Sequence, residues 1–269
     1  MNKKHVVLTF SKYHGTGNDF ILIDNRNLFF PAEDQQLVAF LCHRQFGIGA
    51  DGLILLQNHT GFDFEMRYFN ADGKEATMCG NGGRCAVHYA RKLGIITVNT
   101  SFLANDGVHI AYIEKEIISL KMKSVDQVKI INESYLLDTG SPHLVIFSEN
   151  IDQLNVIKEG REIRYDRNIS EKGVNVNFAQ ITSRNNILLR TYERGVEMET
   201  YSCGTGSVAT AIATCLKNEE PSGDYVYLIR VTGGSLQVSF TKKPGNLFDD
   251  IILTGSATFV YAGEIPLEM

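Results

Sequence analysis

The sequence predicts an α+β protein of two structurally similar domains from an internal duplication, each a mixed or antiparallel sheet curled around a central helix. Three observations support this fold class. Short β-branched or aromatic runs bounded by Gly, Asn and Asp recur along the whole chain. Helical periodicity is confined to a few segments. The pattern Cys-Gly-x-Gly, followed at once by a helical pattern, occurs twice, at residues 79–82 and 203–206.

The first half begins with strand signals and contains two predicted helices. The first helix is expected within residues 31–47, with Pro31 near its start and Gly47 after its end. The second follows the first Cys-Gly-x-Gly and ends at Gly94. The expected strands are residues 5–15, 19–27, 52–58, 62–70, 96–100, 107–114 and 118–124.

The second half repeats this order loosely. A short polar helix is expected near residues 150–160, and a longer helix follows the second Cys-Gly-x-Gly, over residues 206–218. The expected strand regions are residues 134–147, 175–181, 186–195, 225–240 and 250–265.

The two halves align over a strand, a turn, the Cys-Gly-x-Gly and a helix. "RYFNADGKEATMCGNGGRCAVHYARKLG" matches "RTYERGVEMETYSCGTGSVATAIATCLKN", at a separation of about 124 residues. That period is too long for a solenoid repeat. We therefore expect an N-terminal half over residues 1–124 and a C-terminal half over residues 125–257, with residues 258–269 packing back on the first half.

Composition limits the classes of function. The net charge of −5 and the absence of a basic run argue against nucleic acid or a membrane surface as a partner. No apolar run reaches the length of a membrane span, and the N-terminal run is too short for a signal peptide, so a cytoplasmic protein is expected. The five cysteines are irregularly spaced, which indicates free thiols and no closed zinc site.

Cys79 and Cys203 occupy places where a thiol can become reactive. The first N–H groups of a helix lack intrahelical partners, and the helix dipole adds positive charge there. A thiolate is stabilised at such a position, and glycines allow the backbone to approach a ligand closely. The other cysteines, Cys42, Cys85 and Cys215, fall within helical patterns and are expected to be core residues.

A pair of such thiols suits stereoinversion. One thiolate removes a proton from one face of a carbon, and one thiol delivers a proton to the other face. Two duplicated halves that face each other would bring Cys79 and Cys203 to opposite sides of one cleft.

The chain resembles the diaminopimelate epimerases over nearly its whole length. The resemblance rests on an ordered set of motifs, which is far more specific than any single Cys-Gly-x-Gly. The motifs are "KYHGTGNDF" (12–20), "GIGADGLI" (47–54), "YFNADGKEATMCGNGGRC" (68–85), "TGSPHLV" (139–145), "GVNVNF" (173–178), "YERGVEMETYSCGTGS" (192–207) and the late "GEI".

The resemblance implies a cofactor-independent and metal-independent isomerase. It would interconvert LL- and meso-diaminopimelate in the cytoplasm, for lysine and peptidoglycan precursors, with its active site between the two halves. It implies Cys79 and Cys203 as the acid/base pair, His143 and Glu193 as residues that tune them, and a homodimer with Tyr261 in the subunit contact. The implied substrate-binding residues are Asn18, Asn70, Gly80, Asn81, Ser141, Asn175, Glu193, Arg194, Gly204 and Thr205.

Two positions depart from the family pattern. Ser141 stands where many members carry Asn, and Gly52 stands where some carry Gln. A serine hydroxyl is shorter than an amide and has one donor, so contacts to the substrate could differ while the reaction class stays the same.

Other functions remain open at this point. Proline racemases and phenazine-biosynthesis isomerases share the duplicated architecture, although "HGTGNDF" and "CGNGGRC" favour the diaminopimelate enzyme. A thiol redox protein could use Cys79 and Cys203, but Cys-x-x-Cys is absent. A non-catalytic binder of small anions at two helix N-termini is the third alternative.

Overall fold

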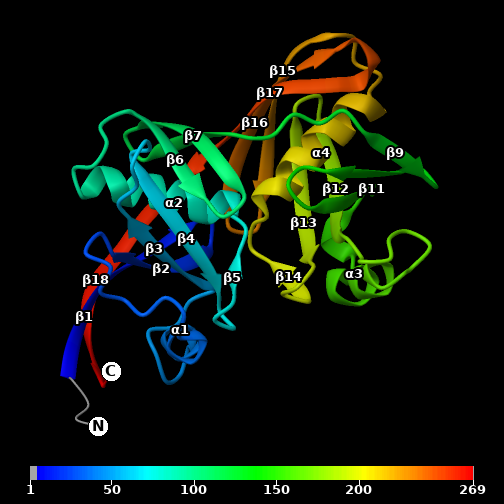
Figure 1. Cartoon of the computed structure of the whole chain (residues 1–269). Coiled ribbons are helices and arrows are strands. Elements are labelled where there is room, and N and C mark those ends of the chain that lie inside the picture. Colours follow the sequence, from blue (N-terminus) through cyan, green and yellow to red (C-terminus); the bar gives the residue numbers. More distant parts are fainter. Residues whose placement is uncertain (1–4, 269) are drawn as a thin grey trace. The chain divides into compact units, whose positions relative to one another are not determined.

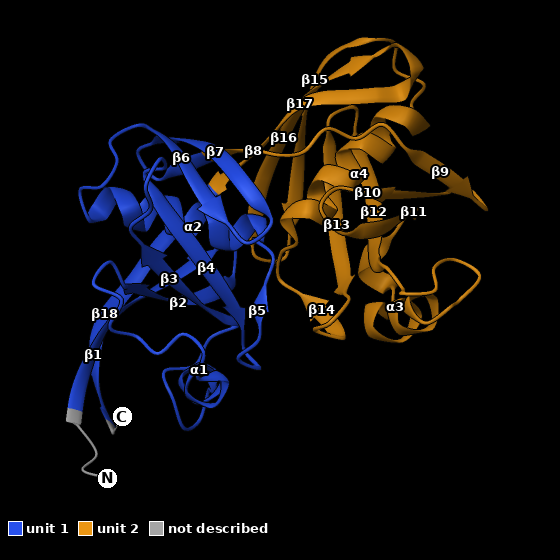
Figure 2. Cartoon of the chain, viewed as in Figure 1, with its two compact units in different colours: residues 1–118, 256–269 blue, residues 119–255 orange. Residues whose placement is uncertain are grey.

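The computed structural model describes residues 5–268, which form two compact units (Figure 2). Unit 1 comprises residues 5–118 and 256–268, and unit 2 comprises residues 119–255. The division of the chain into two epimerase halves, residues 1–124 and 125–257, stays a prediction. No helix among the described residues combines the length and apolar character that a membrane span needs.

Unit 1 is a mixed sheet with two helices (Figure 1). The strands lie in the order β18, β1, β2, β3, β4, β6, β7. Neighbours are antiparallel except for the parallel pairs β2–β3 and β4–β6. The elements are β1 (His5–Gly15), β2 (Asn18–Asp24), α1 (Gln35–Cys42), β3 (Gly52–Gln57), β4 (Phe64–Asn70), β5 (Glu75–Ala76), α2 (Gly80–Lys92), β6 (Asn99–Ala104), β7 (Gly107–Glu114) and β18 (Thr258–Glu268).

Unit 2 repeats this arrangement. Its strands lie in the order β9, β10, β11, β12, β13, β15, β16, β17, with β11–β12 and β13–β15 parallel and the rest antiparallel. The elements are β9 (Val128–Ile131), β10 (Ser134–Asp138), β11 (Pro142–Phe147), η1 (Ile151–Gln153), α3 (Val156–Arg164), β12 (Asn175–Ser183), β13 (Asn186–Glu193), β14 (Met198–Thr200), α4 (Gly204–Lys217), β15 (Gly223–Val231), β16 (Gly234–Lys243), η2 (Pro244–Asn246) and β17 (Leu247–Ser256). Strand β8 (Ile117–Lys121) includes the boundary between residues 118 and 119.

The pairing patterns correspond strand by strand. The parallel pair β2–β3 matches β11–β12, and the parallel pair β4–β6 matches β13–β15. Helices α1 and α3 fill the same connection, and α2 and α4 follow the matching strands β5 and β14. The predicted fold class, two similar domains of mixed sheet and few helices, is confirmed.

Helices α2 and α4 are the central helices of the two units. Helix α2 contacts β1, β2, β3, β4 and β7, and α4 contacts β10, β11, β12, β13, β15 and β16. A helix surrounded by a curved sheet must be apolar or small on nearly all sides. Accordingly, α4 consists mostly of Ala, Val, Ile, Thr and Gly and is almost wholly buried, and α2 is buried along most of its length. This enclosure fixes the N-terminus of each helix.

The first helix is shorter than predicted. Helix α1 begins after Asp34, whose carboxylate accepts a hydrogen bond from Leu37 N, and it ends at Cys42 because His43 is extended. The residues up to Gly47 form a loop that packs back on the helix. A Cβ at Gly47 would lie 2.0 Å from the Phe40 carbonyl oxygen. Helical periodicity alone cannot reveal this reversal of the chain.

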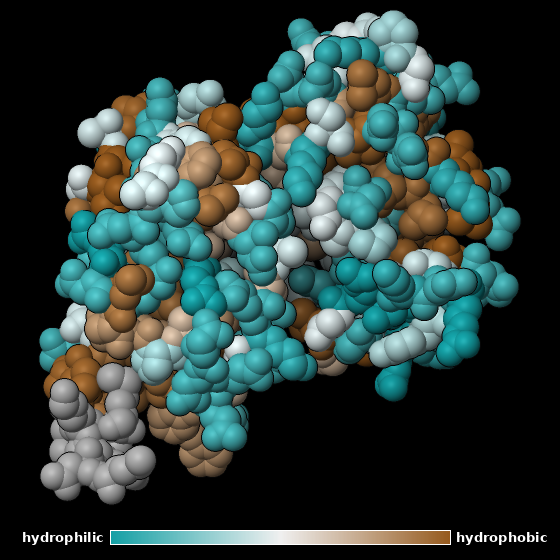
Figure 3. All heavy atoms as spheres, in the orientation of Figure 1, coloured by the Kyte–Doolittle hydropathy of each residue, from teal (hydrophilic) through white to brown (hydrophobic). Residues whose placement is uncertain are grey.

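Both units bury apolar cores, but apolar side chains also reach the surface. Unit 1 packs Ile21, Leu53 and Leu55 of its sheet against α1. On β7 the side chains alternate, and Val108, Ile110 and Tyr112 are exposed on the outer face. Hydrophobic groups of atoms appear over this region and at other places on the same face, between hydrophilic ones (Figure 3).

Candidate functional site

Cys79 is the N-cap of α2. Its backbone is extended, and its sulfur accepts a hydrogen bond from Gly82 N at 3.2 Å. An N-cap normally carries a hydroxyl or carboxylate that accepts from this N–H. Here a sulfur takes that role, which places it against the positive end of the helix dipole.

Asn18, the first residue of β2, connects Cys79 to Asp51, which precedes β3. Asn18 Oδ1 lies 3.8 Å from Cys79 Sγ and accepts from Asn81 Nδ2 at 3.2 Å. Asn18 Nδ2 donates to the Asp51 carboxylate at 2.7 Å. Because a carboxylate only accepts, this contact fixes the amide with its oxygen toward the helix N-terminus.

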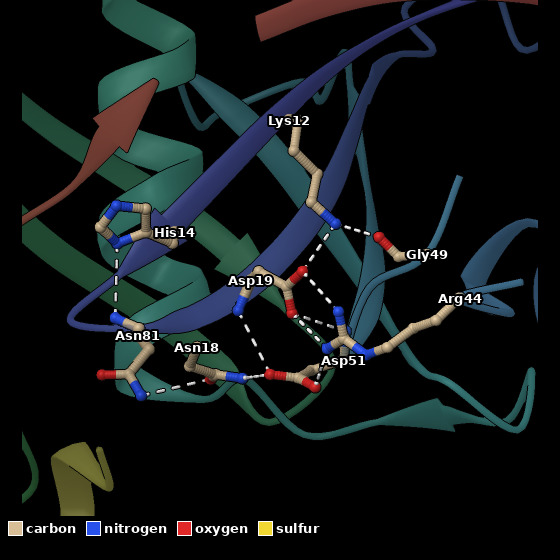
Figure 4. A network of polar contacts seen from close by, with 9 residues as sticks. Lys12, His14, Asn18, Asp19, Arg44, Gly49, Asp51 and Asn81 are labelled. Carbon is tan, nitrogen blue, oxygen red and sulfur yellow. Dashed lines mark hydrogen bonds and ion pairs between the residues drawn. The ribbon is translucent and has the colours of Figure 1, made fainter. Parts of the chain in front are cut away.

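A charged network holds Asp51 in place between α1 and β3 (Figure 4). Arg44 bridges Asp19 and Asp51 at 2.8 and 2.7 Å, and the Lys12 ammonium lies 2.7 Å from Asp19 and donates to the Gly49 carbonyl. Burial alone would raise the pKa of Asp19, but the hydrogen bonds from Arg44 and Lys12 outweigh it and lower the pKa to about 2.

Arg84 is completely buried on the second turn of α2. Its guanidinium donates to Asn81 Oδ1 at 2.9 Å, Thr16 Oγ1 at 3.1 Å, and the backbone oxygens of Gly80 and Ser256. These partners are all neutral, and burial lowers the pKa of the guanidinium. A guanidinium nevertheless stays protonated in proteins, so Arg84 keeps a positive charge behind the helix N-terminus, and it orients Asn81.

Asn70 ends β4 and forms the next turn. It pairs with Gly52 across β3–β4, and Gly73 N donates to its carbonyl. Its side chain is exposed.

Cys203 is the matching N-cap of α4. Gly206 N donates to its sulfur at 3.4 Å, and the hydroxyl of Thr205 lies 3.5 Å away from the same atom. The side chain of Cys203 is nearly buried. The same capping geometry thus occurs at the same place in both units.

Thr205 contacts His143 of β11, which belongs to a group of hydrogen-bonded polar residues. His143 Nε2 lies 2.9 Å from Thr205 Oγ1 and 3.0 Å from Ser141 Oγ. Asn175 donates from Nδ2 to Ser141 Oγ at 3.0 Å and accepts from Arg194 N at 2.8 Å. Burial, with the nearby charge of Arg194, lowers the pKa of His143 to about 3, so this imidazole is neutral.

The structure places the predicted site residues in two groups, one in each unit. In unit 1, Asn18, Gly80 and Asn81 lie at Cys79, whereas Asn70 lies in the turn after β4. In unit 2, Gly204 and Thr205 form the first turn after Cys203, Glu193 ends β13, and Ser141, His143, Asn175 and Arg194 are linked to that turn by hydrogen bonds. Tyr261 lies on β18 of unit 1 and belongs to neither group.

Sequence reasoning missed the residues that support these groups. Asp51 stands in the quoted motif "GIGADGLI", and Asn177 follows Asn175 by two positions in "GVNVNF". Residues two apart on a strand share a face, so the second asparagine carried a signal that could have been used. Lys12 and Arg84 also stand in quoted motifs, "KYHGTGNDF" and "YFNADGKEATMCGNGGRC", whereas Arg44 lies outside all of them.

The three remaining cysteines are buried, as expected, and burial raises the pKa of each. For Cys42 the pKa rises to about 12. They therefore stay protonated thiols at neutral pH. Among residues 5–268 no three His, Cys, Asp or Glu side chains gather as a metal site requires.

Comparison with known proteins identifies relatives over most of the chain. The family model described as diaminopimelate epimerase matches residues 10–122 and 135–260. Diaminopimelate epimerase of Flavobacterium psychrophilum is 51% identical over 251 residues, which cover 93% of this chain and 97% of the relative. That of Chlorobaculum tepidum is 41% identical over 264 residues, covering 94% and 99%.

Solved structures show the same fold at low sequence identity. A phenazine-biosynthesis protein of the PhzF family from Bacillus anthracis has a TM-score of 0.79 at 14% identity, covering 97% of this chain and 99% of its own. A hydroxyproline epimerase from Agrobacterium vitis has a TM-score of 0.72 at 14% identity, covering 98% and 93%. The predicted resemblance to the epimerases is confirmed by the family match and the curated relatives.

The two N-cap turns are expected to respond differently to the same substitution. A Cβ at Gly206 would lie 2.4 Å from the buried Asn177 Oδ1, which a hydrogen bond from Thr191 Oγ1 holds in place. A Cβ at Gly82 would lie 3.2 Å from Ile54 Cδ1 and 3.4 Å from Met66 Cε, both flexible ends. Gly206→Ala should therefore lower the free energy of unfolding by about 2–3 kcal/mol, and Gly82→Ala by less than about 1 kcal/mol.

Urea denaturation of both variants measures this difference. Equal losses at the two glycines would show that Asn177 yields to the new methyl group.

The network around Asp19 should make stability depend on pH in acid. The carboxyl has its pKa lowered from 3.8 to about 2, so its contribution is complete above about pH 4 and is lost as the pH falls toward 2. We expect about 2 kcal/mol from this group. Asp19→Asn should be less stable at pH 7 and show a flatter decline between pH 4 and 2.

Free energies of unfolding at several pH values test this, with Asp126→Asn, an exposed carboxyl, as the control. If the free energy of unfolding of Asp19→Asn declined between pH 4 and 2 as steeply as that of the wild type, other groups would be responsible for the acid sensitivity.

Proposed function

Because the chain belongs to the diaminopimelate epimerase family, we propose that it interconverts LL- and meso-2,6-diaminopimelate without a cofactor. The chain is an isomerase by this membership, and its relatives bear the name of that reaction over nearly their full length. The observation that carries the mechanism is the duplicated cap, a cysteine sulfur that accepts an N–H at the start of α2 and again at the start of α4. The products would serve lysine and peptidoglycan precursor synthesis.

Cys79 and Cys203 form the proposed acid/base pair. A thiolate takes the α-proton, which leaves an electron pair on the α-carbon, and the other thiol donates its proton to the opposite face. The first sulfur becomes a thiol and the second a thiolate, so the reverse reaction starts from the product state. The helix N-termini favour the thiolate form at either sulfur, which supports a reaction that must run in both directions.

The remaining residues would bind the substrate. Negative charge builds on the reacting carboxylate as the α-proton leaves, and N–H donors at a helix N-terminus stabilise it. Gly80 and Asn81 at α2, with Gly204 and Thr205 at α4, are the proposed donors. At the distal end of the substrate, which does not react, an ammonium and a carboxylate group must both be recognised. The residues proposed to bind these groups and to make further hydrogen bonds to the substrate are Asn18, Asn70, Ser141, Asn175, Glu193 and Arg194.

His143 and Glu193 are proposed to tune the cysteines. The support for His143 is its neutral, buried imidazole beside Thr205, whose hydroxyl lies near Cys203 Sγ. A neutral imidazole can orient the Thr205 hydroxyl, and through it influence the sulfur, without adding a charge of its own.

The proposed reaction has a direct test. In D₂O with LL-diaminopimelate and no added cofactor, the α-proton NMR signal should disappear as the meso isomer forms. Cys79→Ala and Cys203→Ala should each lower the rate by at least about 10³-fold, because each removes one proton-transfer group. Cys42→Ala, which removes a buried thiol of α1, is the control and should keep activity.

Wild-type turnover in either variant would contradict the two-base mechanism. Exchange with proline but not with diaminopimelate would point to a related racemase, and binding without exchange would leave only an anion binder.

A homodimer is proposed through the ribbon of β1 and β18, which lie side by side (Figure 1). Apolar side chains are exposed along it, including Val7, Val260 and Tyr261. The ring of Tyr261 also packs edge-on against Phe10 at 5.9 Å, which holds it in place. Cytoplasmic location is proposed as well, and all five cysteines are free thiols, as a reducing compartment would keep them.

Light scattering on the wild type and on Tyr261→Asp tests the dimer. The variant should be monomeric, because a buried unpaired carboxylate opposes association. Tyr112→Asp, at a similarly exposed tyrosine on β7, should remain dimeric. A monomeric wild type, or a dimeric Tyr261→Asp, would contradict this surface.

A further inference from the structure

Asn177 lies on β12 beside the site but contacts no reacting group. Its side chain is completely buried. The amide nitrogen Nδ2 lies 3.2 Å from the Leu144 carbonyl, 3.4 Å from the Asn175 carbonyl and 3.0 Å from His143 Nδ1. The amide oxygen accepts from Thr191 Oγ1 at 3.1 Å. Every polar atom of this buried side chain is thus satisfied.

These partners leave one orientation for the Asn177 amide. Backbone carbonyls only accept, so the NH₂ group must face Leu144 and Asn175. A flipped amide would set its oxygen against two carbonyl oxygens and lose the donor hydroxyl of Thr191. The NH₂ group therefore also faces His143, and His143 Nδ1 must accept.

The acceptor role of Nδ1 determines the tautomer of His143. The imidazole is neutral at physiological pH because it is fully buried. A neutral imidazole has one N–H, and since Nδ1 accepts, the proton is on Nε2. That nitrogen lies between Thr205 Oγ1 and Ser141 Oγ.

The proton on Nε2 in turn orients Thr205. Ser141 Oγ already accepts from Asn175 Nδ2 at 3.0 Å. When Thr205 Oγ1 accepts from His143, its own hydroxyl proton is left for another acceptor, and Cys203 Sγ lies 3.5 Å away. The hydrogen bonds then run in one direction, from Thr191 through Asn177, His143 and Thr205 to the sulfur.

We propose that Asn177 is a positioning residue that locks His143 in the Nε2–H tautomer and thereby aims the Thr205 hydroxyl at Cys203 Sγ. The proposal rests on the proposed function only in taking Cys203 as a reacting thiol. With the opposite tautomer, unprotonated Nε2 would accept from Thr205, and the sulfur would lose a donor. Stabilisation of the Cys203 thiolate would then fall.

The first unit supports its cap by different means. The residue two positions after Cys79 is Asn81, which the buried Arg84 and Asn18 orient. A cation stands behind one thiol, and a neutral relay stands behind the other. The relay is the chain of hydrogen bonds from Thr191 through Asn177, His143 and Thr205 to Cys203 Sγ. Its direction depends on the orientation of the Asn177 amide, so Asn177 is the residue to change.

The tautomer can be observed directly by long-range ¹H–¹⁵N NMR of the histidine rings, with the His143 signals assigned from their loss in His143→Gln. The wild type should show a protonated Nε2 and an unprotonated Nδ1. Asn177→Asp offers a carboxylate that needs a proton from Nδ1, so Nδ1 should become protonated. Thr191→Val, which leaves both carbonyl contacts of Asn177 in place, should keep the wild-type tautomer.

Turnover is measured on the same samples. Asn177→Asp should lower kcat for epimerisation at least about tenfold, with KM changed less, because the sulfur and not the substrate pocket is affected. Asn25→Asp, at a buried asparagine of unit 1 whose oxygen accepts from Phe30 N, should retain activity. If Asn177→Asp does not fold, Asn177→Leu replaces it, and a mixture of tautomers is then expected.

Several results would overturn the proposal. These are a protonated Nδ1 in the wild type, an unchanged tautomer in Asn177→Asp despite lost turnover, and full turnover despite a changed tautomer. If the wild type does not epimerise diaminopimelate, the proposed function fails separately. The relay is then judged by the rate at which methyl methanethiosulfonate modifies Cys203, which should fall severalfold in Asn177→Asp.

Discussion

A sulfur atom that accepts a hydrogen bond at the start of a buried helix is the constraint on which the site depends. The cap requires a cysteine in extended conformation, a glycine three residues on and a helix whose direction cannot change. The sheets that enclose α2 and α4 keep the direction of each helix fixed. A helix free to tilt would move its N–H groups off the sulfur, and the dipole would no longer favour the thiolate.

The two units keep this cap and differ in what supports it. In unit 1 the support is ionic, because Lys12, Arg44 and Arg84 hold the carboxylates and amides around Cys79. In unit 2 it is neutral, because His143 is too deeply buried to hold a charge. A reaction that uses one thiol as acid and the other as base has use for such asymmetry, since identical surroundings would not distinguish the two sulfurs.

The departures from the family pattern can be judged from the structure. Ser141 accepts from Asn175 and lies within hydrogen-bonding distance of His143, so the short side chain still joins the polar group of unit 2. Gly52 pairs with Asn70 across β3–β4, and a Cβ there would lie 2.6 Å from the ring of Tyr68. The same Cβ would lie 2.6 Å from the Phe69 carbonyl oxygen, so a larger residue at Gly52 would require both the Tyr68 ring and the backbone of β4 to move.

The sequence by itself determined the fold class, the duplication, the family and the two caps, because these depend on local patterns and on an ordered set of motifs. It also indicated Asn18, Asn81, His143 and Asn175 through those motifs. Only the tertiary structure decided how they are oriented. Asp51 fixes the amide of Asn18 from 33 residues away, and Asn177 fixes the proton of His143 from 34 residues away. Such partners meet through strand pairing, so neither periodicity nor spacing along the chain can reveal them. The direction of a hydrogen bond depends on every neighbour of a buried group, and those neighbours exist only in the folded sheet.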